Sequence, residues 1–253
     1  MAHQLGTALY NANHDIVEIY NRSYNKGTSL ARKIRAKAVE KIGELDPDID
    51  LIIIAVSDDA INNISRQLGE NKWQSVIIVH TSGSVPSTAL NSLSSYGVFY
   101  SFQSMTAGQE MDFKQVPILV HSNSEQNTDL LIQLAESISD KVYKVSDEQR
   151  GIIHVAGVFA NNFSNHMVTV AHDILAKNEL PLEVIKPLIV NTLQKILEMD
   201  PIDAQTGPAV RGDTDVMDKH IKFLEDQPEL KNLYRLISDS IIVYHESNNP
   251  ATT

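Results

Sequence analysis

Residues 148–175 read EQRGIIHVAGVFANNFSNHMVTVAHDIL, and this pattern predicts one long helix. The segment 151–170 contains no Lys, Arg, Asp or Glu, whereas a surface helix carries charge on one side. We therefore expect this helix to be buried. At about 100° per residue, Asn161 and Asn165 lie within about 20° of His154, on one narrow stripe. Buried amides and imidazoles need hydrogen-bond partners. The polar groups of this stripe therefore either bond to other groups inside the core or face a ligand cleft.

The composition excludes several classes of protein. The chain has 253 residues, enough for one large or two small domains, and a net charge of −11, which argues against a nucleic-acid partner. Cysteine is absent, which excludes disulfides and thiol catalysis and fits a reducing compartment. The longest apolar runs, such as 51–56, are too short to cross a bilayer, and no secretory signal is visible. We expect a cytoplasmic protein with no membrane partner.

The remaining pattern divides the chain in two. Apolar strand-like runs alternate with helical patterns up to residue 145, which predicts an α/β domain with a doubly wound, mostly parallel sheet. Only helical patterns follow. The expected domains are 1–147 and 148–253. Strands are expected at 15–20, 51–56, within 75–80, and at 97–100, 116–121 and 141–145. Helices are expected at 2–13, 28–42, 61–68, 124–139, 148–176, 182–199 (kinked at Pro187), 215–226 and 228–245.

The first residues resemble the second half of a dinucleotide-binding unit. Such a unit runs strand, G-x-G-x-x-G/A, helix; Ala2 would take its last small position, and 3–13 would be its helix. The following strand normally ends in an acid when the cofactor is NAD. Here it ends in Asn21, Arg22 and Ser23, and a guanidinium with a hydroxyl suits a 2′-phosphate. These residues therefore favour NADP, unless they form only a solvated turn.

Two polar loops follow successive apolar strands. Loops at these places touch the ribose and nicotinamide of a bound dinucleotide, and small residues allow the backbone to approach closely. Ser/Gly loops are also common as plain turns. The prediction of a cofactor site therefore depends on both loops following successive strands, not on either loop alone. The cofactor-binding candidates in the two loops are Val56, Ser57, His80, Thr81, Ser82 and Gly83.

The segment 206–213, TGPAVRGD, joins two expected helices of the second domain. Arg211 binds anions by its chemical type, and with Thr206 it is a candidate for substrate binding. The alternative for Arg211 is an ion pair with Asp213 or Asp215. The nine histidines show no HxxxH or HExxH spacing, so we expect no metal site.

Several segments together resemble one family. They are HTSGS at 80–84, GVFYSFQSM at 97–105, DFKQVPILV at 112–120, EQRGIIHVAGVFANNFSNHM at 148–167 and QTGPAVRGD at 205–213. The chain is similar to the NADP oxidoreductases that join a Rossmann-like first domain to a helical domain of formerly unknown function, with a layout like that of pyrroline-5-carboxylate reductase and the F420-dependent NADP reductases. It departs from them in lacking the first strand and glycine-rich turn, and in having Tyr100-Ser101 where the family has Tyr-Pro.

The resemblance implies an oxidoreductase with a Rossmann NAD(P)-binding domain, whose substrate the family does not fix. Our first interpretation is an NADP-dependent reductase acting on a small carbonyl or imine substrate. His154 would be the proton donor, since imidazole changes charge near neutral pH, and Asn161 and Asn165 would position the substrate near the 80–84 loop. The alternative is a nucleotide-binding sensor or assembly module without turnover.

The resemblance also implies a helical dimerisation domain. The apolar faces of 151–170, 182–199 and 228–245 exceed what one helical domain of roughly 100 residues can cover. We therefore expect a two-fold dimer built mainly from residues 150–245, burying well above about 2,000 Å².

The beginning of the chain carries one more expectation. A sheet of this kind is wound outward from its first strand, and the sequence starts inside the dinucleotide fingerprint. We expect the natural protein to extend roughly 10–15 residues upstream, as a strand and a glycine-rich turn.

Overall fold

The computed structural model of the chain describes residues 1–69, 72–105 and 111–248. It forms two compact units, Met1–Met167 and Val168–Thr253, which are described separately below. The division falls inside a long helix, whereas the sequence placed a domain boundary at residue 147; that boundary stays a prediction. No helix within the described ranges is both long enough and apolar enough to cross a membrane.

The first unit is built on parallel strands. β1 (Glu18–Tyr20) and β2 (Lys37–Val39) pair as a two-stranded parallel sheet. A second sheet has the order β3-β4-β5-β6-β7, and all its pairs are parallel except β5 with β6. Its strands are β3 (Leu51–Ile54), β4 (Ile77–His80), β5 (Tyr96–Ser101), β6 (Ile118–Ser122) and β7 (Val142–Lys144). The expected mostly parallel sheet is confirmed.

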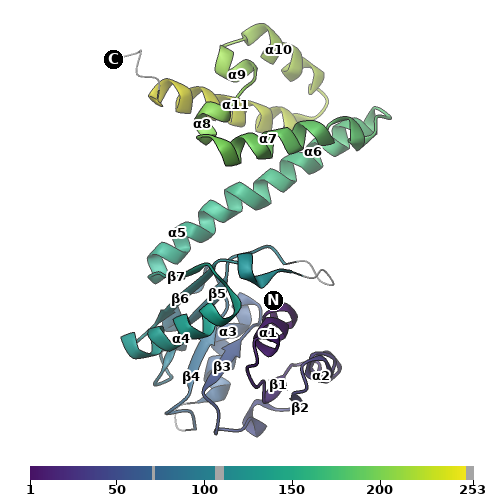
Figure 1. The fold of residues 1–253 in the computed structure, drawn as a ribbon. Helices are drawn as coiled ribbons and strands as arrows, with labels where there is room; N and C mark the ends of the chain where they lie inside the picture. The colour runs from purple at the N-terminus through teal and green to yellow at the C-terminus, as the bar shows by residue number, and fades with distance from the viewer. Residues whose placement is uncertain (70–71, 106–110, 249–253) are drawn as a thin grey trace. The chain divides into compact units, whose positions relative to one another are not determined.

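Helices cover both faces of the five-stranded sheet (Figure 1). One core cluster joins alternate strand residues such as Val79 and Phe99 to α1 (Ala2–Asn11) and α4 (Glu125–Ile138). The other joins Ile54 and Ile78 to α3 (Asp58–Leu68) and the 3-10 turn η2 (Ser87–Leu90). Successive strand residues point to opposite faces, so the continuous apolar runs of β3 and β4 supply both cores. This is the doubly wound arrangement that the sequence predicted.

One predicted helix was wrong. The range 28–42 was expected to be helical, but α2 spans Tyr24–Lys33 and is followed by β2. Arg35 has a φ of 57°, in the left-handed region, and a helix cannot continue through such a residue. Residues 37–39 then pair with β1. Pairing with a distant strand decided their structure, and local propensity did not reveal it.

The stretch 148–175 is helical throughout but not uniform. α5 (Asp147–Gly157) passes into a π-helical segment, η4 (Val158–Phe163), and then into α6 (Ser164–Lys177). Ser146 caps its start, accepting a hydrogen bond from the Gln149 N–H at 3.1 Å, while the Gln149 side chain accepts from the Ser146 N–H at 2.8 Å. This reciprocal capping box fixes where the helix begins.

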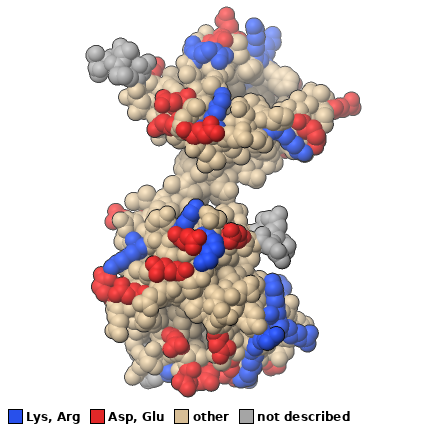
Figure 2. Space-filling view, viewed as in Figure 1, with Lys and Arg blue, Asp and Glu red and all other residues tan. Residues whose placement is uncertain are grey.

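The expected burial of this helix is not found in the single chain. Its apolar side chains are largely exposed, Ile152 to 63% and Phe159 to 65%. Its central part, residues 151–170, contains no Lys, Arg, Asp or Glu, and the corresponding surface is tan in Figure 2. The uncharged sequence is typical of a buried helix. Within one chain, too few neighbouring residues cover this helix to bury it.

The second unit is entirely helical over its described residues. The 3-10 turn η5 (Leu182–Val184) precedes α7 (Lys186–Glu198). Pro187 therefore lies in the first turn of a helix, and the expected longer helix with a kink at Pro187 is not found. Proline is favoured there because its missing N–H would have no intrahelical partner. The other helices are α8 (Pro201–Ala204), α9 (Pro208–Arg211), α10 (Thr214–Phe223) and α11 (Pro228–Asn248).

Candidate functional site

His154 lies where α5 passes the carboxyl end of β5. Its Nδ1 is 3.2 Å from the hydroxyl oxygen of Tyr100, and the two rings meet edge to face with their centroids 6.1 Å apart. Tyr100 is the next-to-last residue of β5, and Gly83 in the loop after β4 lies against both rings. The ends of two parallel strands and one helix therefore bring these three residues together, at the sheet edge where doubly wound folds bind ligands.

Two glycines permit the close approach of these elements. A Cβ at Gly83 would stand 2.8 Å from Cζ of Tyr100 and would also collide with Nδ1 of His154. One turn further along α5, a Cβ at Gly157 would stand 2.6 Å from Cε2 of Phe102. Such distances lie far inside ordinary carbon contacts. Side chains at these positions would displace the rings of His154, Tyr100 and Phe102 from where they lie.

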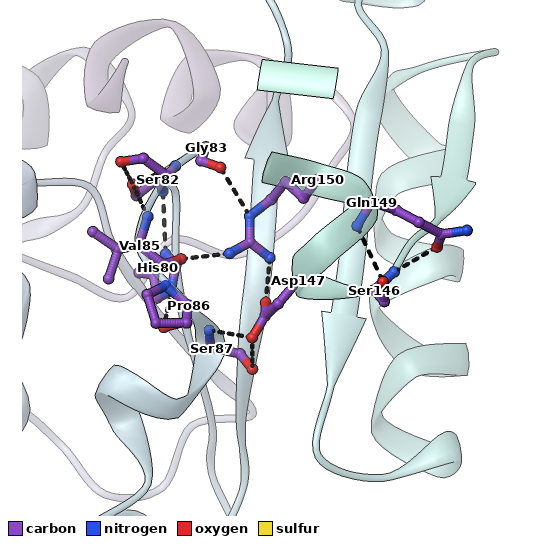
Figure 3. A network of polar contacts seen from close by, with 11 residues as sticks. His80, Ser82, Gly83, Val85, Pro86, Ser87, Ser146, Asp147, Gln149 and Arg150 are labelled. Carbon is purple, nitrogen blue, oxygen red and sulfur yellow. Dashed lines mark hydrogen bonds and ion pairs between the residues drawn. The ribbon is translucent and has the colours of Figure 1, made fainter. Parts of the chain in front are cut away.

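A buried arginine fastens the loop after β4 to the start of α5 (Figure 3). Arg150 is 1% exposed. Its guanidinium donates to the backbone oxygens of Gly83, at 3.3 Å from Nε, and of Val85, and it pairs with the carboxylate of Asp147. Asp147 also accepts from the N–H and hydroxyl of Ser87, both at 2.8 Å. Burial disfavours the charged form of Asp147, but the hydrogen bonds from Arg150 and Ser87 outweigh it and lower the pKa of that carboxyl.

His80 is part of this framework. It is fully buried; its Nδ1 accepts from the Ser82 N–H at 3.2 Å, and Nε2 lies 3.3 Å from the backbone oxygen of Pro86. These two contacts are satisfied together only by a neutral ring with its proton on Nε2. Burial lowers the pKa of His80 to about 4, against the opposing hydrogen bond to Pro86. His80 therefore holds the loop in place as a neutral imidazole.

The other predicted residues of the two polar loops lie next to this framework. Val56 and Ser57 are exposed at the start of α3, and Thr81 and Ser82 are buried. The Ser84 hydroxyl joins the loops by donating to Asp58 Oδ2 at 2.6 Å. The structure therefore brings the loop after β3 and the loop after β4 together.

The residues predicted for the cofactor's phosphates lie elsewhere in the first unit. Ala2 is the first residue of α1. Asn21 accepts from the Ser23 N–H at 2.8 Å, which forms a tight turn before α2, and Ser23 caps that helix with its backbone while its side chain makes no capping bond. Arg22 is exposed, and within the described residues it has no ion pair. An unpaired guanidinium beside a free hydroxyl is a donor set that fits a phosphate monoester.

The π-helical segment changes the helix between His154 and the two asparagines. The predicted stripe assumed a regular α-helix, but Asn161 lies within η4 and Asn165 beyond it, and a π turn closes i→i+5 hydrogen bonds. The rotation of about 100° per residue therefore does not carry from His154 to Asn165. Asn161 and Asn165 are exposed, and their positioning role stays a prediction. Single π turns in helices are frequent at functional sites.

Thr206 and Arg211 lie in the second unit, on either side of Gly207, whose φ is 120°. α9, which ends at Arg211, packs against α10 and α11. Asp213 caps α10 by accepting from the Val216 N–H at 3.2 Å. The alternative ion pair of Arg211 with Asp213 or Asp215 is absent from the described residues, and Arg211 is exposed. Its role in substrate binding stays a prediction. The described part of the chain also shows no cluster of three metal-ligating side chains.

Sequence reasoning missed Tyr100, Arg150 and Asp147 as members of this site. Tyr100 was named only as the end of an expected strand and in a departure from the family pattern, and Arg150 and Asp147 were assigned no role. One signal was available: Tyr100 ends a strand adjacent to the loop that was singled out, at the same edge of the sheet. The burial of Arg150 had no local signal, because it depends on carbonyls more than 60 residues away in the chain.

Comparisons with known proteins show the family and the fold of the chain. A domain of unknown function, DUF2520, matches residues 116–241. A Bacteroides fragilis protein named a "putative NADP oxidoreductase" is 36% identical with a TM-score of 0.87, over 95% of this chain and 93% of that one. No curated protein matches the sequence.

Two more distant structures share the fold. An imine reductase from Myxococcus stipitatus, in complex with NADP+, is 14% identical with a TM-score of 0.62, over 98% of this chain and 92% of that one. A 1-pyrroline-5-carboxylate reductase from Streptococcus pyogenes is 13% identical with a TM-score of 0.60, over 96% of this chain and 95% of that one. With the likeness to the Bacteroides fragilis protein extending over nearly the whole of both chains, this chain belongs to the NADP oxidoreductase family that joins a Rossmann-like domain to a helical domain.

Proposed function

We propose that the protein is an NADP-dependent oxidoreductase that transfers hydride between NADP(H) and a small carbonyl or imine substrate. The observation that carries the proposal is the placement of His154. Its imidazole lies at the carboxyl edge of a Rossmann-like sheet, against Gly83 and Tyr100. That edge is where such folds hold a dinucleotide. The names of the Bacteroides fragilis and Myxococcus stipitatus proteins support the choice of NADP.

The proposed roles follow from the chemistry of each group. Asn21, Arg22 and Ser23 would hold the 2′-phosphate, Ala2 would lie at the pyrophosphate, and the loops at 56–57 and 80–83 would contact the ribose and nicotinamide. The bound cofactor supplies the hydride. His154 supplies a proton to the substrate's oxygen or nitrogen. Thr206 and Arg211 would bind an acidic group of the substrate.

Binding of the two reduced cofactors tests the cofactor assignment. A charge-assisted contact contributes about 1.5–3 kcal/mol, so NADPH should bind about tenfold or more tightly than NADH in calorimetry or fluorescence titration. Arg22→Ala should remove most of this preference. Arg32→Ala, at the far end of α2 and also exposed, is the matched control and should leave it intact. Equal affinities in the native protein would contradict the assignment.

Turnover tests the activity itself. NADPH oxidation should be followed by the loss of its near-ultraviolet absorbance with a panel of cyclic imines and 2-keto acids. The His154→Ala variant should lose about 10²–10⁴-fold in rate. Tight NADPH binding without turnover of any panel member would favour the nucleotide-binding sensor or assembly module.

We also propose that the protein works as a homodimer through its helical part. Leu224 is the one buried apolar residue found in the described part of the second unit. Large apolar side chains are exposed along α7 and α11, among them Leu197 at 86% and Leu236 at 70%. A helix is stable when its apolar face is covered, and the two-fold dimer is the commonest homo-oligomer among soluble proteins.

A further inference from the structure

Tyr100 and His154 form a hydrogen-bonded pair whose second ring nitrogen is left for other partners. The phenol oxygen is 3.2 Å from Nδ1. Among the described residues, Nε2 of His154 has no hydrogen-bond partner, and the Tyr100 hydroxyl has none besides Nδ1. We propose that Tyr100 is a positioning residue for His154: its hydroxyl holds Nδ1, so that Nε2 is the nitrogen that delivers the proton. This inference rests on the proposed function.

A hydroxyl suits both charge states of the imidazole. It carries one O–H donor and two acceptor lone pairs. When the ring is neutral, the phenol donates to a bare Nδ1, and the ring proton lies on Nε2. When the ring is charged, Nδ1–H donates to the phenol oxygen. The hydroxyl proton turns about its C–O bond, and no heavy atom moves. A carboxylate in the same place could only accept, which would favour the charged ring.

The proton balance fixes what Nε2 does. In the reductive direction the charged ring gives its Nε2 proton to the substrate's oxygen or nitrogen while the cofactor's hydride adds to the adjacent carbon. The N–H bond at Nε2 breaks, an O–H or N–H bond forms on the substrate, and the neutral ring at first keeps its other proton on Nδ1, donated to Tyr100. Solvent then returns a proton to Nε2, and when the ring rests neutral solvent has taken the proton on Nδ1, so that Tyr100 again donates to Nδ1. Tyr100 remains a phenol throughout.

Other contacts keep the Tyr100 hydroxyl in place and protonated. Burial raises the pKa of Tyr100, and the negative charge of Asp58 raises it further. The ring is held edge to face by Phe102, with centroids 6.0 Å apart. Gly83 leaves room for the two rings to meet, because a Cβ there would displace both. The hydroxyl therefore has a fixed position, from which it reaches Nδ1 alone among the described residues.

The first test reads the ring directly and needs no turnover. Two-bond ¹H–¹⁵N correlation spectra of the full-length protein, assigned by loss of signals in His154→Ala, report which ring nitrogen carries the proton. We expect the neutral ring to carry it on Nε2, with Nδ1 hydrogen-bonded. In Tyr100→Phe, which keeps the aromatic ring, the Nδ1 resonance should move to that of a free lone pair. A neutral ring protonated at Nδ1 in the resting protein, without cofactor or substrate, or an Nδ1 resonance unchanged in Tyr100→Phe, would overturn the proposal.

The second test asks whether Tyr100 acts through His154. With NADPH and the panel member that the native protein reduces, Tyr100→Phe should lower kcat about 10–100-fold with little change in KM. In the His154→Ala background the same change should have no further effect, since a positioning residue needs the group it positions. Tyr96→Phe, on the same strand but remote from His154, is the control and should retain native kcat. Equal losses in both backgrounds would show a merely structural role and overturn the proposal.

The two tests separate the failure of this inference from the failure of the proposed function. Suppose that the native protein shows no turnover but its spectra still show Nδ1 held by Tyr100. This result contradicts the oxidoreductase proposal and, with it, proton delivery by His154. It supports only the hydrogen bond between Tyr100 and His154. Native turnover together with equal losses in the two backgrounds contradicts the role of Tyr100 alone.

Discussion

At the scale of single residues, His80 shows how burial turns a titratable group into a structural one. The ring is fully buried, and both of its nitrogens are used by the loop backbone. Protonation would turn Nδ1 from an acceptor into a donor facing the Ser82 N–H, in a place that water does not reach. The loop that carries Gly83 therefore depends on a neutral His80.

This predicts a pH dependence of stability. The pKa of His80 is lowered from 6.5 to about 4 in the folded state. The unfolded chain binds a proton at His80 at a higher pH than the folded chain does. The stabilisation of the folded state by neutral His80 is therefore complete above about pH 6.5 and is lost as the pH falls toward about 4. A difference of this size corresponds to about 3 kcal/mol. Urea unfolding at several pH values measures the change.

His80→Gln, which keeps an N–H donor and removes the titration, is the comparison for this experiment. Its free energy of unfolding should be lower near neutral pH but should fall less steeply in the same window. An equal slope in the two proteins would assign the pH dependence to other groups, such as Asp147, whose lowered pKa makes its stabilising contribution disappear at more acidic pH.

At the scale of elements, the Arg150 guanidinium connects α5 to the loop after β4. Removing one partner of a buried ion pair leaves the other charge unpaired. In Arg150→Met, the Asp147 carboxylate loses its counter-charge, and two backbone oxygens lose their donor. We expect a loss of about 3–5 kcal/mol in the free energy of unfolding, measured by urea denaturation.

Arg66→Met provides the matched control for this prediction. Arg66 is an exposed arginine on α3, and its replacement should change stability by less than about 0.5 kcal/mol. A similarly small loss in Arg150→Met would contradict the structural role of the guanidinium. Because Gly83 is one of the two attached residues, the Arg150 variant should also weaken the contact between His154 and Tyr100.

At the scale of the whole molecule, the exposed apolar faces predict self-association. Val190, Leu193 and Leu197 lie on one side of α7, since they are three and four residues apart; Leu193 is 57% and Leu197 86% exposed. The native protein should be a dimer by light scattering at micromolar concentration. Leu193→Glu with Leu197→Glu should shift it toward monomer, because an interface would then bury unpaired carboxylates.

Gln194→Glu controls for added charge on the same helix. Gln194 is exposed and points about 100° away from Leu193, so this variant should keep the native mass. A native protein that is monomeric, or a double variant that stays dimeric, would contradict an interface on this side of α7.

Local patterns were sufficient for much of this protein. The apolar runs at 51–56 and 75–80 and the change from alternating to purely helical patterns after residue 145 predicted the layers and their order, because periodicity acts within a few residues. The same patterns selected His154 and the 80–84 loop, whose contact the structure shows through Gly83.

The tertiary structure decided what depends on residues distant in the chain. Residues 37–39 became a strand because β1 lies beside them, and Arg150 became buried because the carbonyls of Gly83 and Val85 meet it. Tyr100 joined His154 only when α5 crossed the end of β5. The π segment likewise changed a helical wheel that assumed regular geometry. Such contacts close long loops of chain, so their stability comes from packing and desolvation that no local pattern encodes.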